Sequence, residues 1–141
     1  MKKYYFVIVL SIVGFVVSIS SCKKDDDGPT FEESVIKIDS IVHADTVALG
    51  GTLSIQFYGV IGDGCDYFSR FEDIPLDDGE YENSFKIKIW RKTETGVECT
   101  EQIKYLDGST INLTGMLAGK FVIKVFQPDD SFIESEVFIK Q

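Results

Sequence analysis

The sequence has little of what most enzymes use for catalysis. It contains one histidine, His43, and three cysteines, and it lacks a glycine-rich phosphate loop, an HExxH zinc motif and a GxSxG nucleophile motif. Histidine is the commonest general base, and no serine close to His43 in the sequence has a nucleophile context. We therefore expect no active site and no cofactor, and we interpret His43 as a residue at the end of a strand.

Positive charge is also scarce, with 14 lysine and arginine side chains against 23 acidic ones. Lys2 and Lys3 lie in a predicted export signal, so the mature chain would keep 12 cationic side chains and a net charge of −11. Such a chain repels phosphate backbones, and we expect no nucleic-acid partner. The 120 residues after the signal suffice for one domain with one core.

Charged residues are absent from Tyr4–Ile19, which follows the positive start Met1-Lys2-Lys3. This pattern, with small residues after it, predicts a secretory signal at residues 1–21. Ile19-Ser20-Ser21-Cys22 resembles the lipobox of bacterial lipoproteins, and the resemblance implies that Cys22 becomes the lipidated first residue, anchored in a membrane. The alternative is an uncleaved transmembrane anchor, for which Tyr4–Cys22 is nearly long enough.

Apolar residues are missing from the stretch between Cys22 and Phe31. We interpret residues 22–33 as a flexible acidic tether, because such a segment cannot pack. Its start, Lys23-Lys24-Asp25-Asp26-Asp27, resembles the segment after the lipidated cysteine in Bacteroidota surface lipoproteins. The resemblance implies attachment to the outer membrane facing outward. A tether of any polar composition, with the domain on the periplasmic face, is the alternative.

No apolar pattern of helical spacing is long enough to predict a helix in residues 34–141. Apolar and polar residues instead alternate with period two in residues 36–39, 53–58, 85–90, 121–126 and 133–140. Turn-forming sequences separate these runs, and Asp107-Gly108 is typical of a tight hairpin. The pattern predicts an all-β domain, an antiparallel β-sandwich of about seven strands.

Two segments resemble immunoglobulin-like domains. Residues 46–55 are similar to their edge strand, turn and second strand, and residues 117–125 to their penultimate strand. The resemblance implies an immunoglobulin-like sandwich. The family usually has a tyrosine where this chain has Phe121, so the hydrogen bond that such a tyrosine makes to the backbone is not expected.

Lipidation of Cys22 would leave a pair of cysteines, Cys65 and Cys99. An even pair in an exported protein predicts a disulfide. A metal site is the alternative, but two cysteines and His43 are too few at local spacing for zinc, so we expect no metal.

The long connection at residues 61–81 carries aromatic residues among Asp and Gly. Loop aromatics contact sugars or protein partners, so Tyr67, Phe68, Phe71 and Tyr81 are the predicted ligand-binding residues. Alternatively Phe68 and Phe71 fold inward and part of the segment is a strand. The acidic residues of this stretch do not have EF-hand spacing and are interpreted as a solvated loop. Trp90 is expected either at a second buried face or exposed.

These features favour a cell-envelope lipoprotein whose β-sandwich is a non-catalytic binding or accessory module, with a glycan or protein ligand. An envelope hydrolase or inhibitor that uses acidic and aromatic loop residues is a second hypothesis. A structural subunit of an envelope complex is the third.

Overall fold

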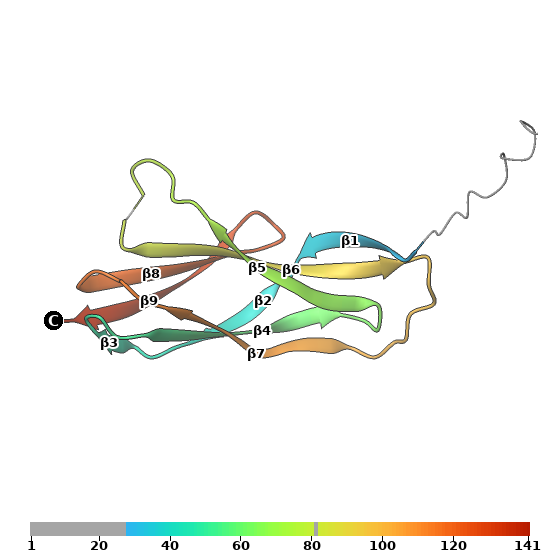
Figure 1. Cartoon of the computed structure of the whole chain (residues 1–141), viewed down its shortest axis with the longest axis horizontal. Helices are drawn as coiled ribbons and strands as arrows, with labels where there is room; N and C mark the ends of the chain where they lie inside the picture. Colours follow the sequence, from blue (N-terminus) through green and yellow to red (C-terminus); the bar gives the residue numbers. More distant parts are fainter. Residues whose placement is uncertain (1–27, 81) are drawn as a thin grey trace, which may run out of the picture.

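The computed structural model describes residues 28–80 and 82–141. The predicted signal, Cys22, the first part of the tether and Tyr81 lie outside the described residues. The described part of the chain forms nine strands and no helix (Figure 1). It therefore contains no helix long and apolar enough to cross a membrane.

The strands form two sheets that face each other (Figure 1). The six-stranded sheet has the order β1-β6-β8-β9-β3, with β5 also paired to β6, and the three-stranded sheet has the order β2-β4-β7. The strands are β1 (Thr30–Val35), β2 (Ile38–Val42), β3 (Thr46–Ala48), β4 (Leu53–Gly62), β5 (Asp66–Ile74), β6 (Ser84–Thr95), β7 (Lys104–Leu113), β8 (Gly119–Phe126) and β9 (Phe132–Lys140). The predicted all-β, two-sheet architecture is confirmed.

Alternating burial explains why these segments are strands. Leu53, Ile55 and Phe57 of β4 are fully buried, whereas the residues between them are exposed or half-buried. Side chains of opposite parity point to opposite faces of a strand, so one face of each sheet enters the core. The main core cluster runs from Ile36 to Ile139.

The strand count exceeds the expected seven in part because of two strands. One arises where the sequence predicts a tether, and the other arises in the 61–81 connection, as the alternative interpretation of that segment expects. β1 begins at Thr30, inside the segment 22–33 assigned to the tether, and pairs with β6. β5 occupies much of the 61–81 connection. Both strands pair with β6 through backbone hydrogen bonds. Such pairing does not depend on the side-chain pattern, so alternation of apolar and polar residues does not predict it.

The expectation of purely antiparallel sheets is wrong at two pairings. β6 runs parallel to β8, and β3 runs parallel to β9. Parallel neighbours must be joined by a long connection, and here β7, in the other sheet, lies between β6 and β8 in the chain. Local turn signals carry no information about such pairings.

The hairpin predicted at Asp107-Gly108 is also wrong, because β7 passes straight through it. Ser109 pairs with Phe57 and Asp107 with Tyr58, which leaves Gly108 as an extra residue, with φ 68°. A bulge with glycine in the left-handed region needs the same residue type as a hairpin turn. The Asp-Gly signal is therefore real, but it marks a bulge.

β6 is the central strand of the larger sheet. β5 pairs with it from Ile74 to Asp66 along one edge, so β8 and β1 share the other edge. β8 pairs with residues 84–87 and β1 with residues 90–95. Between them the chain leaves β1 and crosses to the three-stranded sheet, where Ile36 donates its N–H to Ile89 O at 2.8 Å. This crossover interrupts the shared edge.

Candidate functional site

The predicted ligand-binding aromatics lie on strand β5, and they do not act as one cluster. The ring of Phe71 lies 5.6 Å from that of Phe57 and packs against the core. Phe68 is 36% exposed and its ring lies 5.0 Å from that of Phe71. Tyr67, 40% exposed, pairs with Lys92 and points to the opposite face of the sheet. Tyr81 lies outside the described residues.

The outer face of the six-stranded sheet, which points away from the three-stranded sheet, is rich in aromatic side chains. Sequence parity places six of them there: Phe31, Tyr67, Trp90, Phe126, Phe132 and Phe138. Sheet faces exposed to water are normally polar. Phe138 is nevertheless 54% exposed and Phe132 37% exposed. This outer face thus differs from the polar face that is normal for a sheet exposed to water, and exposed apolar patches of this kind commonly mark interaction sites.

Cations lie over these rings. The guanidinium of Arg70 is 5.0 Å from the centroid of Trp90. Lys88 Nζ is 4.5 Å from the centroid of Phe126 and 5.9 Å from that of Trp90. Two further contacts of the same kind join Lys86 to Phe132 and Lys92 to Phe31, at 5.5 and 5.2 Å. This face therefore combines aromatic rings with cations, and it also carries the carboxylates of Glu33 and Glu72, which pair with Arg70.

Trp90 is at the centre of this arrangement and is the only tryptophan of the chain. It lies on the outer face, opposite Ile87 and Ile89, and is half-buried, between the buried and the exposed positions expected for it. Its indole Nε1 is buried and is, among the described residues, the side-chain donor left without a hydrogen-bond partner. A buried N–H without a partner costs free energy, so packing around Trp90 outweighs that cost.

One border of the outer face is an ion cluster around Lys86, whose side chain is only 6% exposed. Its Nζ donates to Asp77 Oδ2 at 3.1 Å and to Glu80 Oε2 at 2.9 Å. The backbone N–H of Asp77, followed by Lys86, lowers the pKa of Glu80 to about 2, and Glu80 in turn raises the pKa of Lys86. These two acidic residues lie in the loop after β5, as expected, and the Asp77 side chain is 83% exposed. Their ion pairs also hold the turn onto the sheet.

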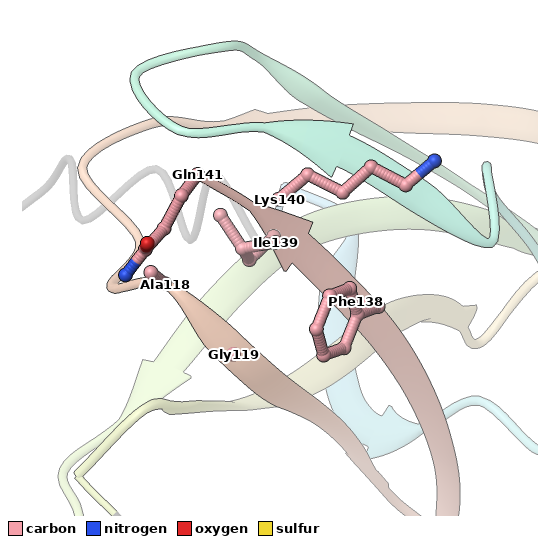
Figure 2. A pocket seen from close by; sticks show the side chains of 6 residues that line it. All are labelled: Ala118, Gly119, Phe138, Ile139, Lys140 and Gln141. Carbon is pink, nitrogen blue, oxygen red and sulfur yellow. The ribbon is translucent and has the colours of Figure 1, made fainter.

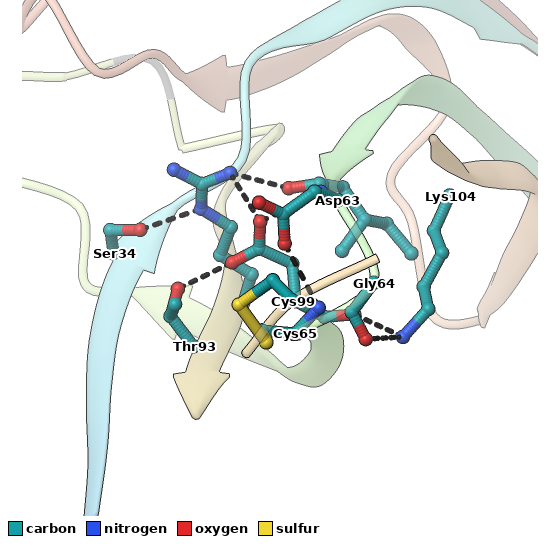
Figure 3. Close-up of polar contacts among 10 residues, drawn as sticks. Ser34, Asp63, Gly64, Cys65, Thr93, Cys99 and Lys104 are labelled. Atoms are coloured by element: carbon teal, nitrogen blue, oxygen red, sulfur yellow. Dashed lines mark hydrogen bonds and ion pairs between the residues drawn. A yellow bond between two sulfur atoms is a disulfide. The ribbon is translucent and has the colours of Figure 1, made fainter. Parts of the chain in front are cut away.

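The predicted disulfide is confirmed. Cys65 and Cys99 are joined, with their Cα atoms 5.2 Å apart (Figure 3). The bond ties the segment between β6 and β7 to the turn between β4 and β5. Asp63 lies within 4.8 Å of both sulfur atoms, but bonded sulfurs are not thiolate ligands, so these three residues form no metal centre.

Beside the disulfide, Asp66 is a buried carboxylate with several donors (Figure 3). Thr93 Oγ1 donates to its Oδ1, the N–H of Asp63 donates to its Oδ2 at 2.9 Å, and Arg91 Nη1 lies 3.5 Å from the same Oδ2. Buried carboxylates are tolerated when they are paired and hydrogen-bonded in this way. The network fixes the corner and holds the guanidinium of Arg91.

Lys104 links this corner to the outer face. Its Nζ donates to Gly64 O at 2.7 Å and to Asp66 O at 3.0 Å, and it lies 3.7 Å from the ring centroid of Tyr67. A Cβ on Gly64 would meet Thr100 Oγ1 at 2.0 Å, so only glycine fits there. Tyr67 is therefore positioned by the disulfide corner and remains partly exposed.

The structure brings a serine to His43 that sequence proximity could not reveal. His43 Nε2 lies 2.6 Å from Ser135 Oγ, and Nδ1 lies 3.0 Å from Ala44 O. Because a carbonyl only accepts, Nδ1 carries the proton in neutral His43 and Nε2 accepts from the serine. The pair resembles the first two members of a catalytic triad, but Nδ1 meets a backbone carbonyl where a triad has a carboxylate. It joins the end of β2 to β9.

A shallow hollow of about 520 Å³ lies at the end of the sandwich where β9 stops. Figure 2 shows Phe138 of the outer face beside it, with Ala118 and Gly119 on the neighbouring strand end and Lys140 and Gln141 at the chain end. Among the described residues, no acidic, serine or cysteine side chain lines this hollow. It extends the outer face and adds no catalytic group.

Comparison of the chain with protein-family models, curated proteins and solved structures gives no match.

Proposed function

We propose that the chain is a lipid-anchored lipoprotein of the bacterial cell envelope whose β-sandwich binds a protein partner, without catalysis, through the outer face of the six-stranded sheet. The observation that carries the proposal is the set of aromatic rings paired with cations on that face. Aromatic residues and arginine are enriched at protein interfaces, and Trp, Tyr and Arg dominate their binding energy.

The arrangement of the cations favours a protein over a glycan. Arg70 lies over Trp90 and Lys88 lies near both Phe126 and Trp90. A sugar that stacks on an aromatic ring needs a bare ring face, and these cations would have to move. Arg70 is already paired with Glu33 and Glu72, whereas Lys88 and Lys92 form no ion pair with a described acidic residue. Acidic side chains of a protein partner can therefore meet these two lysines where they are and bury the rings beside them. We therefore favour an acidic protein surface as the ligand.

The anchor follows from the N-terminal sequence. The lipobox-like Ile19-Ser20-Ser21-Cys22 supports lipidation of Cys22, and the Lys/Asp-rich segment after it supports attachment to the outer membrane facing outward. The described domain begins its first strand at Thr30, eight residues after Cys22. A chain of that length reaches at most about 29 Å, so the anchored domain stays close to the membrane.

We also infer that the sandwich is a divergent immunoglobulin-like domain. β3, the turn after it and β4 fall where the resemblance of residues 46–55 places an edge strand, a turn and a second strand. β8 likewise covers residues 119–125 of the second resembling segment. The parallel pairing of β6 with β8 departs from the antiparallel sheets of that family.

The absence of catalysis is supported by how His43 and the acidic residues are used. His43 binds Ser135 and a backbone carbonyl, and Asp66, Asp77 and Glu80 are engaged in pairs that hold turns. A hydrolase needs such groups to face a substrate. In the described part of the chain, these side chains bind other residues of the domain instead.

The test is site-specific photo-crosslinking in intact cells, with a photoreactive phenylalanine analogue at position 132 or 138. Position 105 is the matched control, because Tyr105 is 64% exposed and lies in the other sheet. We expect one defined protein adduct from positions 132 and 138, none from position 105, and loss of the adduct when Lys88→Glu is added. Equal labelling from position 105, or an adduct insensitive to Lys88→Glu, contradicts the proposal.

A further inference from the structure

A second hollow, of about 450 Å³, lies beside the crossover between β1 and β2. This volume is in the range of small-ligand sites. Its apolar lining comes from Val35, Ile36, Val60, Phe126 and Pro128. Its polar lining comes from Ser34, Lys37, Arg91 and Asp130. The hollow therefore combines apolar walls with a few polar groups, the composition typical of a binding site.

Arg91 occupies an unusual position for an arginine. It is on the side of β6 that carries the fully buried Ile87 and Ile89, so it points between the sheets. Its Nε donates to Ser34 Oγ at 2.8 Å and its Nη1 donates to Ile61 O at 2.6 Å. With Asp66 3.5 Å from Nη1, the guanidinium is fixed in place before any ligand arrives.

The third guanidinium nitrogen of Arg91, Nη2, makes no such internal contact. Among the described residues, no acceptor lies within hydrogen-bond distance of Nη2. Nη2 is not fully buried, so it is exposed to solvent. Lys37 adds a second cation at the rim and has no ion pair with any described acidic residue. In the lining itself two cations lie beside one acidic residue, Asp130, although Asp66 pairs with Arg91 from outside the hollow.

We infer that this hollow binds the C-terminal carboxylate of a polypeptide whose last side chain is apolar. A positioned guanidinium is suited to a planar carboxylate, and Lys37 adds charge attraction. The apolar walls fit a hydrocarbon side chain next to that carboxylate and offer a sugar acid few partners for its hydroxyls. The inference goes beyond the proposed partner face, since it concerns a different site and a different ligand group.

The test uses a form of the chain that starts at residue 23 and so keeps every described residue. N-acetyl-leucine is the probe, and N-acetyl-leucinamide, which lacks the charge, is its matched control. We expect N-acetyl-leucine to shift the backbone amide NMR signals of Val35, Lys37 and Val60, with a dissociation constant of about 1 mM, as for a ligand of so few atoms. The amide should leave these signals unchanged.

One rim variant and one control outside the hollow locate the charge requirement without disturbing the buried network. Lys37→Glu should weaken binding roughly tenfold, whereas Lys140→Glu, the same charge change outside the hollow, should change it less than about twofold. Arg91→Gln should abolish the shifts. If that variant does not fold, Val60→Glu replaces it, because a carboxylate at this exposed position of the lining should also abolish the shifts.

Three results overturn the inference: equal shifts from N-acetyl-leucinamide, tighter binding of glucuronate than of N-acetyl-leucine, or equal effects of Lys37→Glu and Lys140→Glu. None of these measurements depends on the crosslinking result at positions 132 and 138. The two proposals therefore fail separately.

Discussion

Arg70 and Trp90 are direct cross-strand partners in β5 and β6, and the guanidinium of Arg70 lies 5.0 Å from the centroid of the Trp90 ring. Arg70 also forms ion pairs with Glu33 of β1 and Glu72 of β5. The arginine is thus held between two carboxylates above the ring. This contact joins three strands on the outer face and makes Trp90 a natural reporter of anything that binds there.

The unpaired indole N–H predicts the effect of Trp90→Phe. Phenylalanine keeps an aromatic ring and removes a buried donor whose unmet hydrogen bond costs about 1–3 kcal/mol. We expect the free energy of unfolding to stay within about 1 kcal/mol of the original, in contrast to a loss of about 3 kcal/mol for Trp90→Ala. Urea denaturation followed by circular dichroism measures both. A loss in Trp90→Phe as large as in Trp90→Ala would show that the N–H has a partner in solution.

Phe71 and Tyr67 form a matched pair on one strand. Phe71 packs against the core, so Phe71→Ala should lower the free energy of unfolding by about 3 kcal/mol. Tyr67 is more exposed, and Tyr67→Ala should lower it by less than about 1 kcal/mol. Thermal and urea unfolding of the two variants check the difference. Similar losses for both would mean that Tyr67 is also part of the core.

The disulfide should contribute strongly to stability. Cys65 and Cys99 are 34 residues apart, and closing such a loop stabilises by about 4 kcal/mol in the chain-entropy treatment. Replacing both cysteines with alanine should lower the free energy of unfolding by roughly that amount. Reduction of the unmodified protein should give the same loss, which separates the effect of the bond from that of the side chains. An unchanged midpoint after complete reduction would refute the prediction.

The ion cluster predicts a loss of stability in acid. The pKa of Glu80 falls from 4.5 to about 2 on folding, so its contribution is complete above pH 4.5 and disappears as the pH falls toward 2. Glu80→Gln should therefore reduce stability at neutral pH and flatten its dependence on pH between 4.5 and 2. Denaturation curves across this range provide the measurement. Glu82→Gln, an exposed change two residues away, is the control and should keep the original slope.

Lipidation of Cys22 is testable by intact mass. The mature protein should begin at an acylated Cys22, and Cys22→Ala should leave the signal uncleaved. Protease added to intact cells should remove the domain if it faces outward, whereas full protection would place it on the periplasmic side. Normal processing of the Cys22→Ala protein to an unlipidated form would rule out the lipoprotein interpretation.

The strands predicted best are those with one fully apolar side. Residues 53–58, 85–90, 121–126 and 133–140 all lie within strands, because their alternating side chains divide between core and surface. β5 was harder to predict, because Tyr67 and Phe68 put aromatics on both faces and a register shift near Ser69 breaks the period of two. Residues 36–39 divide between the crossover and β2, since Ile36 and Ile38 enter the core from a bend.

Long-range relationships explain most of what the sequence does not reveal about the site. The rings of the outer face come from strands whose neighbours are set by the parallel β6–β8 pairing, so their proximity is invisible in the sequence. The sequence does, however, contain one indication of an aromatic outer face. Trp90, Phe126 and Phe138 each occupy the face of an alternating run that should be polar, and this pattern marks a sheet with two apolar sides.

The placement of β1 has a mechanical consequence. β1 starts at the end of the sandwich opposite the C-terminus (Figure 1), and tension that enters through residues before Thr30 pulls along its length. All six register pairs from Thr30–Thr95 to Val35–Trp90 then resist sliding together, whereas a strand pulled sideways would open one pair at a time. If Cys22 is the anchor and the outer face binds a partner, as proposed, a domain attached in this way resists force as a shear joint and stays folded while the partner pulls on it.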